Sequence, residues 1–267
     1  MKEEDKKELE TEKKKPETEL EKMASAGLHY GHKSSGVHPK MKPYLYGVRN
    51  NIHLIDLEIT KEKLKEALKV IEKLVTENKT ILVVGTKIQI QGMVKDFAEE
   101  CGFFYANLRW LGGTITNFDI IKKRIKHFKD LEGKMERGEL EKYTKREKDK
   151  MKVSLGKFEK RFGGIKYMEK IPDALLVLGM KKDAIAIKEA RTKKVTIIGI
   201  ADSDTDPTLA NYFIPANDDA VSSIKYILDE IKEVVLKVKP KVQTVEPEVT
   251  STEETGDSKE SEVKKEL

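Results

Sequence analysis

The chain has 267 residues, of which 37% are charged and 38% hydrophobic, and its formal net charge is +5. Its single cysteine, Cys101, excludes a disulfide framework, and no apolar run is long enough to span a membrane. The N-terminus is rich in lysine and glutamate, unlike a secretion signal, so we expect a cytoplasmic protein.

Two charged tails flank a basic centre. Residues 1–22 hold 7 lysines and 9 acidic residues, and residues 240–267 hold 4 lysines and 8 acidic residues. Neither segment has enough apolar side chains to offset chain entropy, so both are expected to be disordered, with a short helix possible in the first. Residues 23–239 carry a net charge of +11. That charge favours a polyanionic partner; the alternative is a soluble protein that is merely rich in lysine.

Glycines and prolines interrupt residues 23–57, so we expect irregular structure there with one hairpin. Its two apolar runs, Tyr44–Val48 and Ile52–Leu57, are joined by Arg49, Asn50 and Asn51. Asparagine tolerates the left-handed conformation that a two-residue hairpin turn requires.

From residue 60 onward, amphipathic segments alternate with short apolar runs. The predicted helices are 60–78, about 88–97, 183–191 and one that begins near Asn217 or Asp218, and the predicted strands are 80–84, 103–108, 174–178, 195–200 and 212–214. Continuous apolar strands between amphipathic helices indicate an α/β fold, with a five-stranded parallel sheet covered by helices on both faces.

A long excursion, residues 117–164, interrupts this α/β domain of 23–116 and 165–239. Ile121, Ile125, Phe128 and Met135 recur at heptad-like spacing, and a second apolar series follows a capping box at Thr144. We therefore expect an antiparallel coiled-coil hairpin that projects about 28 Å from the sheet. From residue 122 to 170 there are 18 basic residues against 9 acidic ones, so most of the excess charge lies on this arm. Such charge is either a solvated face or a contact for RNA.

The turn that leads into the arm combines Arg109, Trp110, Gly112 and Gly113. Paired glycines permit a positive φ and leave backbone accessible, and an arginine beside an aromatic ring suits a phosphate or a base. The alternative is a tight turn with Trp110 buried in the core.

The loops after two strands carry residues that could take part in chemistry. Gly85, Thr86 and Lys87 do not complete a phosphate-binding motif, and Asp202, Asp204 and Asp206 could hold Mg²⁺ or simply cap turns. An enzyme that uses the Gly85 and Asp202 loops is therefore the alternative function. No nucleophile, base and orienting group can be assembled, so we predict no catalytic residue and no cofactor.

Four histidines, His29, His32, His38 and His53, lie close together in the sequence. His29 and His32 could bind zinc, but no cysteine or carboxylate lies nearby at ligand spacing. Polar packing or RNA contact is favoured over a metal site, so no metal is predicted.

Several motifs together resemble the S-two family of small-subunit ribosomal proteins, of bacterial type. The resemblance covers about residues 23 to 235, and its most specific element is the series Arg109 to Thr114 followed by Asn117. The other motifs are 24–32, 38–44, 49–56, 171–174, 186–190 and 214–220. Asn51 stands where the family usually has glycine, which puts the hairpin turn type in question.

The resemblance implies a non-catalytic structural constituent of the small ribosomal subunit, with a flavodoxin-like sheet carrying a coiled-coil hairpin. It also implies rRNA and neighbouring ribosomal proteins as partners, with a link to protein S-one where that protein exists, and no membrane or small-molecule substrate. The residues expected to bind RNA are His29, His32, Lys33, Lys40, Lys42, Arg49, Asn50, Arg109, Trp110, Lys122, Lys123, Arg124 and Lys126. These fall into two groups, both expected to flank the Trp110 turn and to grip one RNA junction. The carboxylates of the Asp202 loop repel phosphate and are expected to be dispensable for assembly.

Overall fold

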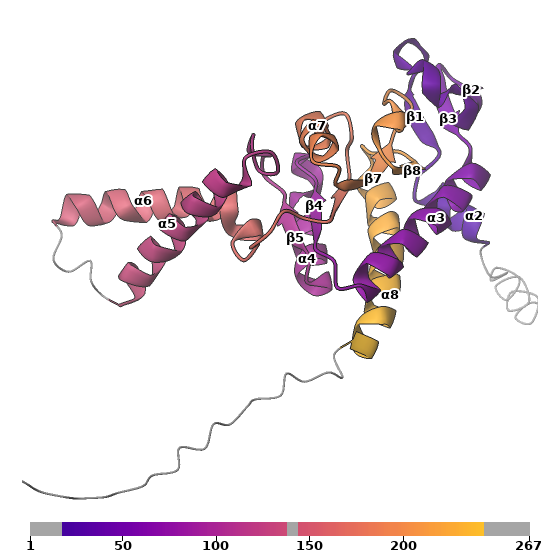
Figure 1. Cartoon of the computed structure of the whole chain (residues 1–267). Helices are drawn as coiled ribbons and strands as arrows, with labels where there is room; N and C mark the ends of the chain where they lie inside the picture. The colour runs from indigo at the N-terminus through magenta and orange to yellow at the C-terminus, as the bar shows by residue number, and fades with distance from the viewer. Residues whose placement is uncertain (1–17, 138–143, 243–267) are drawn as a thin grey trace, which may run out of the picture.

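The computed structural model describes residues 18–137 and 144–242 (Figure 1). Most of the two tails expected to be disordered, residues 1–22 and 240–267, lies outside the described residues. At both ends, regular structure extends past those boundaries. Helix α2, Glu19–Ser25, begins before residue 23, and helix α8, Val221–Val242, continues past residue 239.

A five-stranded parallel sheet forms the centre of the molecule, as the alternating pattern predicted (Figure 1). Its strands lie in the order β5-β4-β6-β7-β8, which is the flavodoxin-like order 2-1-3-4-5. The strand bounds are Ile81–Val84 (β4), Phe104–Ala106 (β5), Ala174–Val177 (β6), Thr196–Ala201 (β7) and Tyr212–Pro215 (β8). Strands β5 and β8 are therefore the two edges of the sheet.

The sheet has a separate apolar core on each face, because successive side chains of a strand point to opposite faces. Val83 and Leu176 pack with helices α3, α4 and α8, whereas Leu82 and Leu175 pack with α7 and the first turns of α5. The helix bounds are Leu57–Thr76 (α3), Gln91–Cys101 (α4), Phe118–Glu136 (α5) and Ala184–Thr192 (α7). The expectation of helices on both faces is confirmed, and Cys101 is buried in the first core.

A smaller, antiparallel sheet precedes the main one, with the strand order β1-β3-β2. The predicted hairpin is present as β2, Leu45–Arg49, and β3, Ile52–Ile55. Asn50 and Asn51 have φ of 49° and 63°, so both residues are left-handed, as a type I′ turn requires. Asn51 thus adopts the left-handed conformation at the position where the family usually has glycine. Strand β1, Tyr30–Lys33, was not predicted and pairs with β3.

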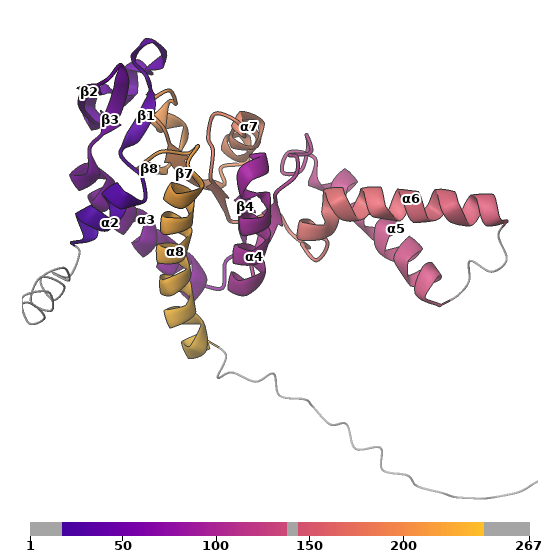
Figure 2. The same ribbon diagram turned by 180° about the vertical axis from the view of Figure 1, so that it is seen from behind.

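The small sheet docks beside β8, the edge strand of the main sheet (Figures 1 and 2). The Asn217 N–H donates to the carbonyl of Leu28, and the His38 N–H donates to that of Ser203. A Cβ added to Gly31 would lie 2.7 Å from Ser203 Oγ and 2.9 Å from Ser203 Cβ, so the Ser203 side chain occupies the space that a side chain at residue 31 would need.

The arm consists of α5 and α6, Lys145–Phe162, and both predicted helices are present. The side chains of Thr144 and Glu147 form the predicted capping box. Figures 1 and 2 show that the helices lie together at the root and diverge toward the tip, and the segment joining them, 138–143, is outside the described residues. The structure therefore does not show the antiparallel coiled coil that we expected.

The heptad-like apolar stripe of α5 packs in the second core of the sheet rather than in the coiled coil that we predicted. Ile121, Ile125 and Phe128 are buried in this core, with Leu82 and Leu175 of the strands. Phe162 of α6 belongs to the same core, and the ring centroid of Phe158 lies 6.0 Å from that of Phe128. Farther out, Met135 is exposed, because there the body of the protein no longer covers α5.

The return from the arm is fixed against strand β5. A Cβ added to Gly164 would lie 2.1 Å from the carbonyl oxygen of Tyr105, so the chain passes directly over the edge strand. In the described ranges, no helix combines the length and the apolar character needed to cross a bilayer.

Candidate nucleic-acid interface

The first predicted group of RNA-binding residues lies on and around the small sheet. Lys33 ends β1, Lys42 belongs to the 3₁₀ segment Pro39–Tyr44, and Arg49 and Asn50 form the tip of the β2–β3 hairpin. All four side chains are exposed, and no carboxylate of the described part of the chain pairs with any of them. They can therefore meet a polyanion without first breaking an ion pair.

Lys40 differs from these neighbours because its charge is already compensated. Its Nζ lies 2.8 Å from Asp206 Oδ2 and donates to the Thr208 hydroxyl, also at 2.8 Å. Although burial raises the pKa of Asp206, the hydrogen bonds from Lys40 and Thr208 dominate and lower it to about 2. Lys40 thus fastens the small sheet to the loop after β7.

The histidines of this region are also packed or paired inside the protein. His29 lines an apolar pocket of about 390 Å³ together with Leu54 and Leu57, and burial lowers its pKa. His38 accepts a hydrogen bond from the Lys40 N–H through Nδ1. His32 lies among carboxylates that come from a distant part of the sequence: its Nδ1 is 3.2 Å from Asp202 Oδ2, and its Nε2 lies 3.5 Å from Asp204 and 3.4 Å from Asp219.

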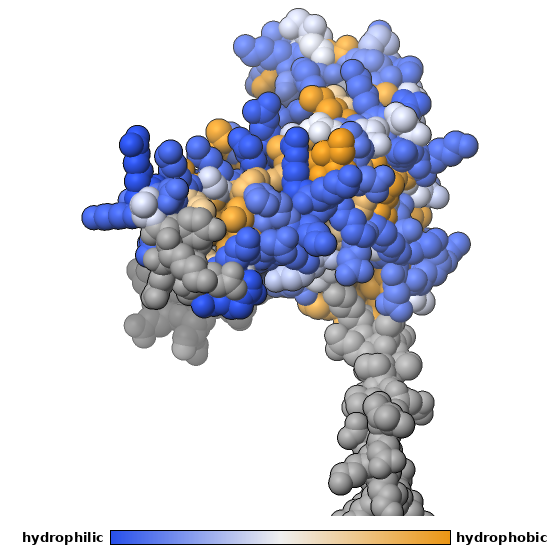
Figure 3. Space-filling model, turned by 60° about the vertical axis from the view of Figure 1, so that its left-hand side comes forward, coloured by the Kyte–Doolittle hydropathy of each residue, from blue (hydrophilic) through white to orange (hydrophobic). Residues whose placement is uncertain are grey.

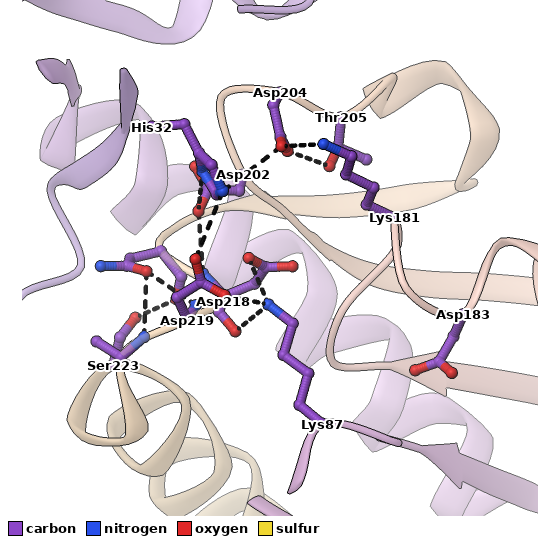
Figure 4. Close-up of polar contacts among 12 residues, drawn as sticks. His32, Lys87, Lys181, Asp183, Asp202, Asp204, Thr205, Asp218, Asp219 and Ser223 are labelled. Carbon is purple, nitrogen blue, oxygen red and sulfur yellow. Dashed lines mark hydrogen bonds and ion pairs between the residues drawn. The ribbon is translucent and has the colours of Figure 1, made fainter. Parts of the chain in front are cut away.

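These carboxylates form a cluster at the carboxyl end of the sheet, where the sequence had suggested a ligand loop (Figure 4). Hydrogen bonding to Asp202 raises the pKa of His32 to about 9, so the imidazole is positively charged at neutral pH. Lys181 Nζ lies 2.6 Å from Asp204 Oδ2. Within the described ranges, no group of acidic, histidine or cysteine side chains has an arrangement that could hold a metal ion. The carboxylates are compensated by cations of the protein itself.

The Gly85–Lys87 segment is part of the same arrangement. Lys87 Nζ lies 2.9 Å from Asp218 Oδ1 and 2.7 Å from Asp219 Oδ1. Burial raises the pKa of Asp218 to about 7 against the opposing effect of Lys87. A Cβ on Gly85 would come within 2.9 Å of Val94, so this glycine serves helix packing rather than the approach of a phosphate. These contacts favour a structural role for both loops.

Asp202, whose loop we expected to repel phosphate and to be dispensable for assembly, is buried. It accepts hydrogen bonds from the backbone N–H groups of Ser203 and Asp218 as well as facing His32. Replacing it would therefore disturb the fold rather than leave it unchanged, because buried donors would lose their acceptor.

The turn before the arm is organised by a residue that the sequence analysis did not single out, Glu189 on α7. Its carboxylate accepts hydrogen bonds from the Trp110 indole at 3.0 Å, from the Gly113 N–H at 2.8 Å, and from the N–H groups of Ile115 and Thr116 at 3.1 Å each. Burial raises its pKa, but these donors outweigh that effect and lower it. The available signal was an acidic residue on the side of α7 that also carries the apolar residues Ala186 and Ala190.

Trp110 is accordingly buried, which confirms the alternative interpretation of this segment as a tight turn with Trp110 in the core. Only 8% of its surface is exposed, so its ring offers no face for a base. The neighbouring Arg109, in contrast, is exposed.

Arg109 meets two basic side chains that the sequence analysis missed, Lys160 and Arg161 at the end of α6. The three residues line two adjoining hollows, of about 170 Å³ and about 310 Å³. Glu159 also lines the smaller hollow, but no described carboxylate pairs with any of the three cations. We call these three residues the basic cleft. A lysine–arginine pair just before Gly163 and Gly164, where the arm returns, was the signal in the sequence.

Lys122, Lys123, Arg124 and Lys126 lie on the exposed side of α5, on the same arm root. Lys122, Lys123 and Lys126 line a groove of about 750 Å³ between α5 and residues 166–169. Among the described residues, Lys123, Arg124 and Lys126 have no carboxylate partner. Figure 3, seen from the side of the arm, shows hydrophilic side chains over most of this face with apolar patches between them.

We had expected both groups of residues to flank the Trp110 turn, but the structure places them apart. The small sheet lies beyond β8 and the arm root lies beyond β5, so the five-stranded sheet separates them (Figures 1 and 2). Only Arg109 and the α5 residues lie near Trp110. We expected both groups close to the turn because the apolar pattern of the sequence does not indicate which strands form the edges of the sheet.

The family model described as Ribosomal protein S2 matches residues 23–237 of the chain. The match includes both sheets, the arm and both groups of basic residues.

Proposed function

The chain belongs to the ribosomal protein S2 family, and from that premise we propose that it binds small-subunit rRNA chiefly through the root of its arm. The family assigns it a structural role in the small ribosomal subunit, and hence in translation. The RNA contact is our inference from the charge distribution. The observation that carries it is the convergence of cations without carboxylate partners on the basic cleft and on α5.

Electrostatics favours this surface over the carboxylate-paired cations His32, Lys40 and Lys87. A phosphate backbone binds where lysine and arginine side chains are both exposed and uncompensated, because compensated cations must first give up a partner. Arg109, Lys123, Arg124 and Lys126 meet both conditions. Arg109 and Arg161 can each form two parallel hydrogen bonds to one phosphate, which gives the basic cleft geometric selectivity.

The exposed residues of the small sheet form a second part of the proposal. Lys33, Lys42, Arg49 and Asn50 would contact a different segment of rRNA, because the whole sheet lies between them and the arm. Four other residues are weaker candidates for RNA contact, because each has a partner or a packing role inside the protein: Lys40, His29, His32 and Trp110. Neighbouring ribosomal proteins, protein S-one among them, and a cytoplasmic location remain part of this proposal.

Co-sedimentation with small ribosomal subunits in a sucrose gradient tests the proposal. We expect the wild-type chain to migrate with the subunit, and the triple variant Arg109→Glu, Lys123→Glu, Lys126→Glu to remain at the top of the gradient. A matched triple variant, Lys65→Glu, Lys69→Glu, Lys225→Glu, reverses exposed lysines on the helices that cover the first core. Loss of co-sedimentation in both variants would argue against a specific arm-root interface.

A further inference from the structure

Tyr167 is an exposed aromatic side chain on the basic arm root. It follows the short 3₁₀ segment Gly163–Ile165, where the chain returns from α6 to the sheet, and 68% of its surface is exposed. Lys129 Nζ lies 4.8 Å from the centre of the ring, and Lys166 Nζ lies 5.6 Å from it. Burial does not account for a tyrosine in this position.

Tyr167 does not itself line the α5 groove of about 750 Å³, but the two lysines whose Nζ atoms lie near its ring, Lys129 and Lys166, both do. Lys166 and Met168, its two neighbours in sequence, both line that groove, as does Lys129. On α5, Lys122, Lys126 and Lys129 follow one another at intervals of four and three residues, so they share one face of the helix. Two carboxylates, Asp119 and Glu169, also line the groove, against five lysines. The surface therefore combines a row of positive charges with an adjacent aromatic ring.

Most of these lysines are available to a ligand. Lys166 is compensated by Glu132, which accepts its hydrogen bond at 2.7 Å, and Lys122 donates to the Glu169 carbonyl at 3.3 Å. Lys123, Lys126 and Lys129 have no carboxylate partner in the described part of the chain. The groove therefore remains basic after its internal contacts are counted.

We infer that this groove binds an unpaired nucleotide of RNA, with phosphates on the Lys122–Lys126–Lys129 row and the base stacked on Tyr167. Proteins that bind single strands combine a basic track with an aromatic platform, because every base has a π-face. In an RNA duplex both faces of a base are covered by its neighbours, so the ligand is a loop, bulge or end. This inference rests on the proposed rRNA binding and specifies which kind of RNA element the arm root takes.

The test compares three variants on two RNAs. A short single-stranded RNA that carries a fluorescent purine analogue reports stacking by quenching, and a duplex of the same sequence serves as the second probe. For Tyr167→Leu we expect single-strand affinity to fall about tenfold, with loss of quenching and an unchanged dependence on salt. Tyr167→Phe keeps the ring and should bind like the wild type. Tyr46→Leu removes another exposed tyrosine, on β2 of the small sheet, and should change nothing.

The outcomes separate this inference from the proposed function. If the wild type binds rRNA and the single strand, but Tyr167→Leu binds the single strand equally well, the inference is wrong and rRNA binding stands. If the wild type binds neither rRNA nor the single strand, both fail. If Tyr167→Leu weakens binding of a polyglutamate peptide as much as that of RNA, the groove serves an acidic protein segment and the nucleotide assignment is overturned. If Tyr167→Leu has the same thermal unfolding as the wild type, its weaker binding results from loss of the ring and not from misfolding.

Discussion

The two edges of the main sheet carry basic side chains in different states. Beside β8, His32 and Lys40 are held by carboxylates of the same chain, at 3.2 Å from Asp202 and 2.8 Å from Asp206. Beside β5, the cations of the basic cleft have no such partner among the described residues. Ion pairs at the first edge attach one sheet to another, whereas the cations at the second are free to attract a polyanion.

This difference shows that the number of basic residues in a region does not identify an RNA interface by itself. Both regions are rich in lysine and arginine in the sequence, and the small sheet contributed more of the predicted residues. What separates His32 and Lys40 from the cations of the arm root is that their charges are already compensated, and that depends on contacts between residues far apart in the chain. Each prediction below perturbs one edge and leaves the other intact.

The largest effect is expected where the arm is fixed to β5. Gly164→Ala would place a Cβ 2.1 Å from the Tyr105 carbonyl oxygen. Because that oxygen belongs to the backbone, it cannot rotate aside. We expect a loss of about 3 kcal/mol in the free energy of unfolding, measured by chemical denaturation. Gly156→Ala is the matched control, because no atom lies within 4 Å of its added Cβ, and it should gain up to about 1 kcal/mol through helix propensity. Equal stability of the two variants would contradict the close approach.

A smaller effect is expected from Glu189→Gln, which keeps the shape of the side chain and removes its charge. The amide would direct N–H groups toward the donors of the Trp110 turn, so we expect a loss of about 2 kcal/mol. Because the folded pKa of Glu189 is lowered, its contribution is present above the unfolded value of 4.5 and is lost as the pH falls through the folded pKa.

Trp110 is the single tryptophan of the chain, so its fluorescence follows this turn directly. We expect the emission of Glu189→Gln to shift to longer wavelength, and that of Glu62→Gln, an exposed glutamate on α3, to match the wild type. Identical spectra and stabilities for the two variants would show that Glu189 does not organise the turn.

At the β8 edge, the expected effect is smaller and depends on pH. The pKa of His32 is raised to about 9 from 6.5, so its stabilising charge is fully present below 6.5 and is lost as the pH rises through 9. Asp218, Lys87 and Lys181 face the same carboxylates, and Asp218 titrates near 7, so the useful window lies between pH 7 and about pH 10.

The measurement compares wild type with His32→Gln by denaturation across that window. The wild type should be more stable at the lower end, and the difference should shrink toward the upper end. A difference that stays constant with pH would mean that His32 contributes through packing alone.

Local patterns in the sequence were sufficient for most of the fold. Apolar runs located all five strands of the main sheet, and two asparagines identified the hairpin turn, because strand burial and turn conformation depend on neighbouring residues. The stripe Ile121, Ile125, Phe128 was assigned to a coiled coil because periodicity reveals a buried face but not what buries it. Likewise, the partners of His32 and Glu189 come from residues far away in sequence, so their roles required the structure.

The central claim, that RNA binding is carried by cations without carboxylate partners, chiefly those of the arm root, and not by the paired Lys40 beside β8, is tested most directly by the salt dependence of affinity for small-subunit rRNA. We predict that Lys123→Glu combined with Lys126→Glu lowers the slope of log affinity against log salt by about two, one for each phosphate that the variant no longer neutralises. Lys40→Glu, which reverses a cation already paired with Asp206, should leave the slope nearly unchanged. Equal slopes for the double variant and the wild type, or a larger drop for Lys40→Glu, would contradict this claim.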